Sequence, residues 1–403
     1  MYIYKAAVIG AGTMGAQIAQ VITYSGLPVI LKDVDQKAVQ SGLETIRKIY
    51  QGRVDKGKMT GAEMEQKMAL VSGATNYDGF GDVDIVIEAI FEDLGVKKKV
   101  LSELDGICPP TTILATNTSS LSISAIAAVT KRPEKVIGMH FFNPAHVMKL
   151  VELIPGLGTS QETTEDLVAF SESLRKIPVR VQECAGFLVN RLLMPYLNEA
   201  AYALQEGASS AKEMDETMLA FGLPMGPFTL LDMIGIDVSA KVAHILYDAY
   251  GPRMEPAALL EKLVSAKRFG TKSGAGIYNY NNPKDETLDK MIQDIQKQTG
   301  KKGTTFSPTR LLLSMVNEAV ICLQEGVASA ADIDIAMLAG TGFPQDKGGP
   351  LHYADQLGID LVLNELEKHR KESGLRFWPA PMLKRMVAAG HLGVKTKRGF
   401  FTY

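Results

Sequence analysis

The stretch Gly10-Ala-Gly-Thr-Met-Gly15 fits the pattern GxGxxG and decides the fold of the first part of the chain. The short apolar run Ala6–Ile9 precedes it as a strand, and an amphipathic segment follows it as a helix. In this setting Gly10 permits a tight turn, Gly12 lets the backbone approach a pyrophosphate, and Gly15 allows the helix to pack closely on the strand. The free N–H groups and partial positive charge of the helix N-terminus favour phosphate.

Short apolar runs alternate with amphipathic segments through residues 1–183. The runs are rich in Val and Ile, and they lie at 6–9, 28–31, 83–90, 112–115, 136–142, 150–154 and 178–181. Alternating strands and helices imply parallel strands joined by crossover helices. The sequence therefore predicts an α/β domain with a Rossmann-type doubly wound sheet over residues 1–183.

A charged helical insertion at residues 37–70 interrupts this alternation after the second strand. It has a break near 52–58, and Thr60 followed by Glu63 is a capping-box signature that begins a second helix. We expect a helical hairpin that projects from the sheet.

An internal repeat organises the chain from Gly186 onward, where strand signals vanish and long helical patterns take over. Residues 197–207 match 316–326, and 214–220 match 333–339, at one offset of 119 residues; 232–237 match 355–360, and 276–280 match 399–403, at an offset of 123. Four blocks in one order predict two tandem all-α domains, at 184–280 and 306–403. The polar segment 281–305 is interpreted as a flexible linker between them.

Composition excludes several classes of function. The 403 residues carry a formal net charge of −2, so no broad basic surface for nucleic acid is expected. We find no apolar stretch of about 18 residues and no signal segment, so no membrane span or secretion is expected. The three cysteines, Cys108, Cys184 and Cys322, lie far apart, which favours reduced thiols in the cytoplasm. We expect no metal site.

Polar residues follow the predicted strands at their carboxyl ends, where open α/β sheets bind ligands. Asp33 ends the second strand, and a carboxylate there accepts hydrogen bonds from the adenosine ribose and repels a 2′-phosphate, which predicts NAD rather than NADP. Ile90 and Glu92 lie at the end of the fourth strand, and Asn117 follows the fifth. Glu92 and Lys97 could equally form a surface pair on the following helix.

A second group of polar residues suggests acid–base chemistry. His140 lies at the end of an apolar strand, and Glu152 follows twelve residues later on the next predicted strand. A strand, a Pro-containing turn and a second strand would bring the two side chains together. A carboxylate beside His fixes its tautomer and stabilises the imidazolium, so the pair is a candidate general base with its orienting group. Removal of a hydroxyl proton while hydride leaves the same carbon needs this arrangement.

Ser119 and Asn190 are candidates for holding substrate oxygens. Ser119 follows the fifth strand, although it could instead cap a helix. Asn190 opens the first long helix of the helical region, where its amide could donate across an interdomain cleft. At the offset of 119 residues Asn190 corresponds to Thr309, whereas Arg191 corresponds to Arg310. A residue that only the first copy carries is better explained by chemistry than by folding.

With these residues in view, the chain resembles the L-3-hydroxyacyl-CoA dehydrogenases of fatty-acid β-oxidation. The residues that carry the resemblance are 10–15, 33, 88–92, 116–121, 140–144, 152, 186–193 and 222–228. The resemblance covers essentially the whole chain, and the combination of His, Glu, Ser and Asn is far more specific than the glycine motif.

The resemblance implies an activity and roles for named residues. The expected reaction is oxidation of an L-3-hydroxyacyl-CoA, such as 3-hydroxybutyryl-CoA, with NAD. The implied catalytic and substrate-positioning residues are His140, Glu152, Ser119 and Asn190. The expected NAD-binding residues are Gly10, Gly12, Thr13, Met14, Gly15, Asp33, Ile90, Glu92, Lys97, Asn117, Ser119 and Asn143. The hairpin would approach CoA, with Arg53, Lys56 and Lys58 as its nearest basic residues.

The chain departs from the short members of that family, which carry one helical domain and pair it with a partner's. Here the second copy is fused, as in the dehydrogenase part of the large multifunctional β-oxidation subunits. We therefore expect an internal pseudo-dimer of helical domains, with further self-association or β-oxidation enzyme partners left open. Two alternatives also remain: a 3-hydroxy-acid or gulonate-type dehydrogenase that acts without CoA, and an NAD-binding scaffold subunit. The acyl-chain length is not determined by the sequence.

Overall fold

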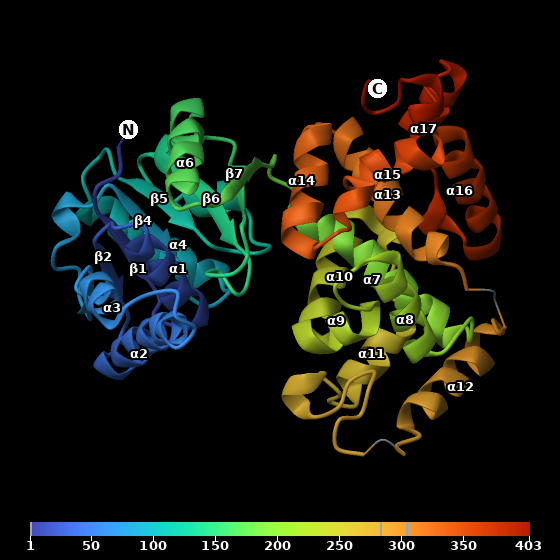
Figure 1. The fold of residues 1–403 in the computed structure, drawn as a ribbon, viewed down its shortest axis with the longest axis horizontal. Helices are drawn as coiled ribbons and strands as arrows, with labels where there is room; N and C mark the ends of the chain where they lie inside the picture. Colours follow the sequence, from blue (N-terminus) through green and yellow to red (C-terminus); the bar gives the residue numbers. More distant parts are fainter. Residues whose placement is uncertain (1, 283, 304–305) are drawn as a thin grey trace. The chain divides into compact units, whose positions relative to one another are not determined.

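The computed structural model describes residues 2–282, 284–303 and 306–403. It separates into two units, Met1–Phe187 and Leu188–Tyr403. The first is an α/β unit and the second is all-helical (Figure 1). The predicted order, a doubly wound sheet followed by an all-helical region, is confirmed.

The first unit is built around one eight-stranded sheet with the order β3-β2-β1-β4-β5-β6-β7-β8. The strands are β1 (Ala6–Ile9), β2 (Val29–Lys32), β3 (Val71–Ala74), β4 (Ile85–Glu88), β5 (Ile113–Thr116), β6 (Val136–Phe141), β7 (Leu150–Pro155) and β8 (Ile177–Arg180). Neighbouring strands are parallel except β6 and β7, which are antiparallel, so the sheet is mixed. The sequence prediction omitted β3, because this half-exposed edge strand reads Val-Ser-Gly-Ala and lacks an apolar run.

Helices cover both faces of this sheet (Figure 1). They are α1 (Thr13–Tyr24), α2 (Gln36–Val54), α3 (Gly61–Met68), α4 (Leu94–Ile107), α5 (Ile123–Ala127) and α6 (Gln161–Ser173). Alternate residues of β1 point into two separate cores: Ala6 and Val8 pack with α1, α2 and α6, whereas Ala7 and Ile9 pack with α4 and α5. The sheet is thus buried on both sides, and its carboxyl edge is left to carry polar residues.

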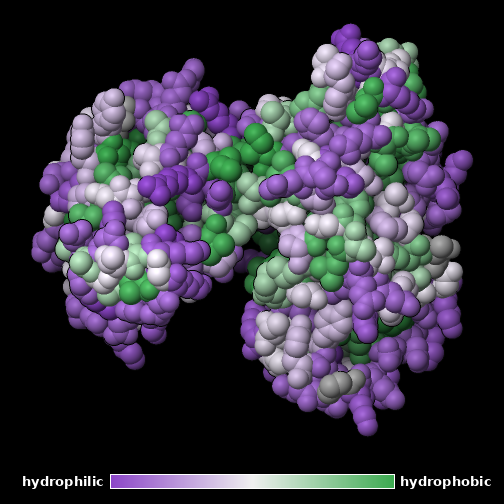
Figure 2. All heavy atoms as spheres, viewed as in Figure 1, coloured by the Kyte–Doolittle hydropathy of each residue, from purple (hydrophilic) through white to green (hydrophobic). Residues whose placement is uncertain are grey.

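The hairpin of α2 and α3 is present, with the predicted capping box at Thr60 and Glu63. It does not project from the sheet as expected. Ile46 and Tyr50 are fully buried, and the Tyr50 hydroxyl lies 2.7 Å from Thr23 Oγ1 on α1. The apolar face of α2 therefore packs on the core, and hydrophilic side chains gather on its outer side (Figure 2).

The second unit repeats one order of helices. The first copy contains α7 (Val189–Gln205), α8 (Ala211–Phe221), α9 (Pro227–Ile234), α10 (Ile236–Tyr250) and α11 (Ala258–Ser265), and the second contains α13 (Pro308–Gln324), α14 (Ala330–Thr341), α15 (Pro350–Leu357), α16 (Ile359–Ser373) and α17 (Pro381–Ala388). Between them lies α12 (Thr287–Thr299), whose Ile295 is buried and whose Gln296 donates to the carbonyl of Gln205. Residues 287–299 of the predicted linker therefore form a helix that packs on α7 and α11, which its polarity did not suggest.

The two copies meet through reciprocal ion pairs between α7 and α13. Arg191 on α7 contacts Glu318 on α13 at 2.7 Å, and Arg310 on α13 contacts Glu199 on α7 at 2.7 Å. These residues correspond to one another at the repeat offset of 119 residues. All four side chains are buried, so each charge relies on its partner in the other copy.

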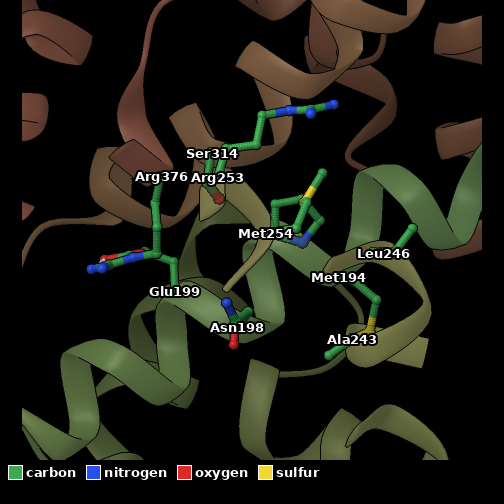
Figure 3. A pocket seen from close by; sticks show the side chains of 10 residues that line it. Met194, Asn198, Glu199, Ala243, Leu246, Arg253, Met254, Ser314 and Arg376 are labelled. Atoms are coloured by element: carbon green, nitrogen blue, oxygen red, sulfur yellow. Dashed lines mark hydrogen bonds and ion pairs between the residues drawn. The ribbon is translucent and has the colours of Figure 1, made fainter. Parts of the chain in front are cut away.

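A small cavity of about 20 Å³ lies beside these pairs, with room for about one water. Met194, Asn198 and Glu199 on α7 line it together with Arg253 and Arg376 (Figure 3).

No helix within the described residues is long and apolar enough to cross a membrane.

Candidate active site

The glycine turn joins β1 to α1 and has the geometry of a nucleotide-binding turn. Gly10 has a φ of +98°, and a Cβ added there would lie 2.6 Å from the carbonyl oxygen of Ala89. A Cβ on Gly15 would lie 1.7 Å from the carbonyl oxygen of Gly10, whereas one on Gly12 would meet nothing within 4 Å. No side chain caps the N-terminus of α1. The residues therefore fit a pyrophosphate above Gly12, which is where NAD would present one.

Asp33 lies directly after β2, beside this turn. Its carboxylate accepts a hydrogen bond from the amide of Ala11 at 2.6 Å and from its neighbour Val34 at 2.6 Å. Lys32 points away and lies 4.4 Å over the ring of Tyr77. The half-buried Asp33 thus presents a fixed negative charge at the edge of the turn, as selection of NAD requires.

Glu92 organises the turn that carries Ser119. Its Oε1 accepts hydrogen bonds from Thr118 Oγ1 at 2.6 Å and from the amide and hydroxyl of Ser119 at 2.9 and 3.2 Å. Burial by itself raises the pKa of Glu92, but the bond from Thr118 and the charge of Lys97 outweigh it and hold that pKa below its usual value. The carboxylate is therefore charged at neutral pH.

Lys97 is fully buried, so its interpretation as part of a surface pair with Glu92 is wrong. Its ammonium lies 2.7 Å from Glu88 and 3.5 Å from Glu92. The contact between Lys97 and NAD stays a prediction; in this structure the Lys97 side chain is fully buried. Lys97 supports Glu92 from the protein side.

Other predicted cofactor residues form the rim of the same sheet edge. Asn117 follows β5, and its Oδ1 accepts a hydrogen bond from the amide of Phe141 at 2.8 Å. Asn143 follows β6, and its Oδ1 lies 3.4 Å from Gln17 Nε2 on α1. Ile90 donates its amide to Glu88 at 2.8 Å. The first two bonds join α1, β5 and β6, and the third orders the turn after β4.

His140 and Glu152 lie directly opposite each other in the antiparallel pair of β6 and β7. His140 Nδ1 and Glu152 Oε2 are 2.7 Å apart, and the residues are 7% and 0% exposed. The rings of Phe142 and Phe187 lie 4.5 and 5.8 Å from the imidazole. Since Nδ1 is engaged by the carboxylate, Nε2 is the nitrogen that can exchange a proton with a ligand.

Asn190 belongs to the second unit, where it is the second residue of α7 and is half-buried. Its counterpart Thr309 lies 2.9 Å from Ser307 Oγ, in a local contact at the start of α13. The neighbouring arginines keep equivalent ion pairs in both copies. The two copies therefore share the scaffold and differ at the position of the amide.

Arg53, Lys56 and Lys58 line one open cleft of about 490 Å³ in the first unit. The sequence did not predict the other basic residues that line it, which are Lys48, His146, Lys149, Arg175 and Lys176. Lys48 lies on α2 with Arg53, whereas the other four lie more than 80 residues further along the chain and reach the cleft only through the fold. Among the described residues that line the cleft, none is acidic.

An aromatic ring and backbone carbonyls hold two basic side chains of this cleft in place. Arg53 lies 4.6 Å from the ring of Tyr24 and donates to its hydroxyl at 2.8 Å. The Lys176 ammonium donates to the carbonyls of Ala145 and Met148, and burial lowers its pKa to about 8. Burial, with the charges of Lys176 and Arg53, lowers the pKa of His146. Such a cleft attracts polyanions.

Within the part of the chain that is described, no group of three or more His, Cys, Asp or Glu side chains could hold a metal ion.

Comparison with known proteins gives a consistent result. Residues 5–184 match the model of the 3-hydroxyacyl-CoA dehydrogenase NAD binding domain, and 186–280 with 306–403 match that of the 3-hydroxyacyl-CoA dehydrogenase C-terminal domain. The fatty acid oxidation complex subunit alpha of Shewanella sp. (strain ANA-3) is 42% identical over 393 residues, which is 95% of this chain and 55% of that protein. The chain thus spans about half the length of the curated relatives it matches.

Two solved structures are also similar. The 3-hydroxybutyryl-CoA dehydrogenase of Escherichia coli is 32% identical with a TM-score of 0.87, over 96% of this chain and 99% of that one. The (S)-3-hydroxybutyryl-CoA dehydrogenase of Ralstonia eutropha is 43% identical with a TM-score of 0.68, over 70% of this chain and 100% of that one.

Proposed function

This chain belongs to the 3-hydroxyacyl-CoA dehydrogenase family, and from that premise we propose that it oxidises L-3-hydroxyacyl-CoA thioesters, such as 3-hydroxybutyryl-CoA, to 3-ketoacyl-CoA. The observation that carries the proposal is the buried pair of His140 and Glu152 at 2.7 Å, on the same sheet edge as the glycine turn. A general base held by a carboxylate beside a nucleotide-binding turn suits the removal of a proton and a hydride from one carbon.

The proposed roles follow from the geometry of each side chain. The glycine turn and Asp33 would hold NAD, which would supply the acceptor for the hydride of substrate C3. His140 Nε2 takes the proton of the 3-hydroxyl group, and Glu152 stabilises the imidazolium that results. Ser119 and Asn190 hold the reacting oxygens. The Ser119 hydroxyl donates to Glu92 in this structure, so it would turn from Glu92 to donate to a substrate oxygen.

The basic cleft supports a CoA thioester over a free acid. CoA carries several phosphate charges far from its thioester, and a cleft lined by basic groups matches them. Arg53, Lys56 and Lys58 are the proposed contacts from the hairpin side, and Lys149 and Arg175 are proposed from the opposite side. The substrate of a gulonate-type dehydrogenase that acts without CoA carries no such phosphates, so this cleft would bind no part of it.

The assay that tests the function follows NADH absorbance with L-3-hydroxybutyryl-CoA and with free 3-hydroxybutyrate. We expect rapid NADH formation with the thioester and little with the acid. Equal kcat/KM for the two compounds would favour the dehydrogenase without CoA. Absence of turnover with a panel of acyl-chain lengths would favour a scaffold subunit that only binds NAD.

Two further proposals concern the assembly of the protein and its location in the cell. The reciprocal ion pairs of Arg191 and Arg310 support an internal pseudo-dimer of the domains at 184–280 and 306–403. Relatives named as alpha subunits of a fatty acid oxidation complex support association with other β-oxidation enzymes. A cytoplasmic location is proposed from the three cysteines, because they lie far apart in the sequence and reduced thiols are usual there.

A further inference from the structure

Glu88, the last residue of β4, is a fully buried carboxylate at the centre of the sheet edge. One oxygen accepts hydrogen bonds from the amide of Ile90 at 2.8 Å and from Lys97 Nζ at 2.7 Å. The other accepts a bond from Thr116 Oγ1 at 2.6 Å, on the neighbouring strand β5. Glu88 thereby joins β4, β5 and α4 just behind the turn that carries Ser119.

Lys97 lies between two carboxylates with different roles: Glu88 neutralises its charge, and Glu92 holds the turn that carries Ser119. Its ammonium is 2.7 Å from Glu88 but 3.5 Å from Glu92 Oε2. A buried ammonium is costly unless a carboxylate neutralises it at close range. Since Glu88 fills that requirement, Glu92 can direct Oε1 to the turn, where it accepts bonds from the amides of Ser119 and Ser120 at 2.9 and 3.2 Å.

We propose that Glu88 is a positioning residue for the dehydrogenase reaction: by neutralising Lys97, it leaves Glu92 in place to hold the Ser119 turn. The proposal rests on the proposed function only for its kinetic consequence. Asn117, in the same segment, accepts from the amide of Phe141, so the turn is also linked to the residue after His140. A shift of Glu92 toward Lys97 would release the turn.

The test begins with Glu88→Gln. This change keeps the shape of the side chain and one acceptor oxygen for the amide of Ile90, while the new NH2 group can donate to Thr116 Oγ1, which donated to Glu88. It leaves Glu92 as the nearest carboxylate to Lys97. We expect Glu92 to move toward Lys97, so that kcat falls about tenfold, the size expected when hydrogen bonds that place a reacting group are lost. The KM for the CoA thioester should change little, since the basic cleft is untouched.

The double variant Glu88→Gln/Lys97→Met distinguishes a loss of Glu92 positioning from a general loss of structure around residue 88. Without the ammonium, nothing draws Glu92 away, so most of the lost kcat should return although two buried side chains are altered. A purely structural role predicts the opposite, with the double variant worse than either single one. Melting temperatures of all variants show whether each is folded.

Hydrogen exchange of the Ser119 and Ser120 amides gives a readout that does not depend on activity. Exchange should quicken in Glu88→Gln and slow again in the double variant. Unchanged exchange and kcat in Glu88→Gln, or a loss that the double variant does not reverse, would overturn the inference. If the wild-type enzyme shows no turnover, the proposed function fails, and the exchange data still decide the role of Glu88.

Discussion

Among single residues, Asp33 makes the sharpest prediction about the cofactor, because its carboxylate is fixed beside the glycine turn by the amide of Ala11. Wild-type kcat/KM should be about 10²-fold higher with NAD than with NADP, since a charged hydrogen bond to the ribose is replaced by repulsion of a phosphate. Asp33→Ala with an added arginine at Val34 should reverse this preference. Lys32→Ala is the control, because Lys32 points away. Equal use of both cofactors by the wild type would contradict the role.

The residues of the site differ in how far the sequence could predict them. The contact of His140 with Glu152 could be predicted, because a strand, a turn and a strand bring residues twelve apart face to face. The burial of Lys97 could not, because it begins a run of three lysines, and nothing in the run shows which one turns inward. Similarly, the separation of Arg53 from Arg175 along the chain conceals that they line one cleft.

At the scale of elements, the basic cleft makes a prediction about pH. Burial lowers the pKa of Lys176 to about 8, so its ammonium is charged below that pH and neutral above it. Affinity for the CoA phosphates should therefore be highest at neutral pH and fall as the pH rises through 8. We expect the KM of the thioester to rise several-fold between pH 7 and pH 9, because the cleft loses one of the positive charges that attract the phosphates.

The variant Lys176→Met checks this assignment, because without a titrating ammonium the KM should become flat over the same range. Lys212→Met, an exposed lysine on α8, serves as the matched control and should retain the wild-type profile. A KM that rises equally in wild type and Lys176→Met would remove Lys176 from the account.

The helices α7 and α13 offer a second comparison, since they are two versions of one element. Asn190→Ala should lower kcat/KM by roughly threefold to tenfold, because a hydrogen bond to a substrate oxygen contributes about 0.5–1.5 kcal/mol. Thr309→Ala, at the matching position of the second copy, should leave kinetics almost unchanged. Equal losses in the two variants would mean that Asn190 has a structural role.

The elements themselves were predicted most accurately where periodicity was strong. The helices of both copies follow from the repeated sequence blocks. In contrast, the sequence did not predict α12, because its residues are mostly polar. Only Ile295 of this helix is buried, so the segment resembles a solvated linker. The edge strand β3 was hidden for the same reason, since edge strands need few apolar residues.

For the whole molecule, the two copies of the helical domain should behave as a pseudo-dimer within one chain. Arg191 is buried, and its carboxylate partners Glu318 and Glu325 both lie in the second copy. A chain that ends at Tyr280 would leave this charge unpaired, at a cost of about 3–5 kcal/mol, and expose the apolar face of α7. We expect the shortened chain to dimerise or aggregate in sedimentation experiments. If it stayed monomeric with unaltered stability, the pseudo-dimer would be wrong.

The central claim is that His140 is the base of an NAD-dependent oxidation of L-3-hydroxyacyl-CoA, and turnover by His140→Gln tests it most directly. The variant should bind NADH like the wild type, while kcat with L-3-hydroxybutyryl-CoA falls by about 10²–10⁴-fold, the usual size of a general-base effect. His244→Gln, which alters an exposed histidine on α10, should leave kcat unchanged. Near-normal turnover by His140→Gln would contradict the account.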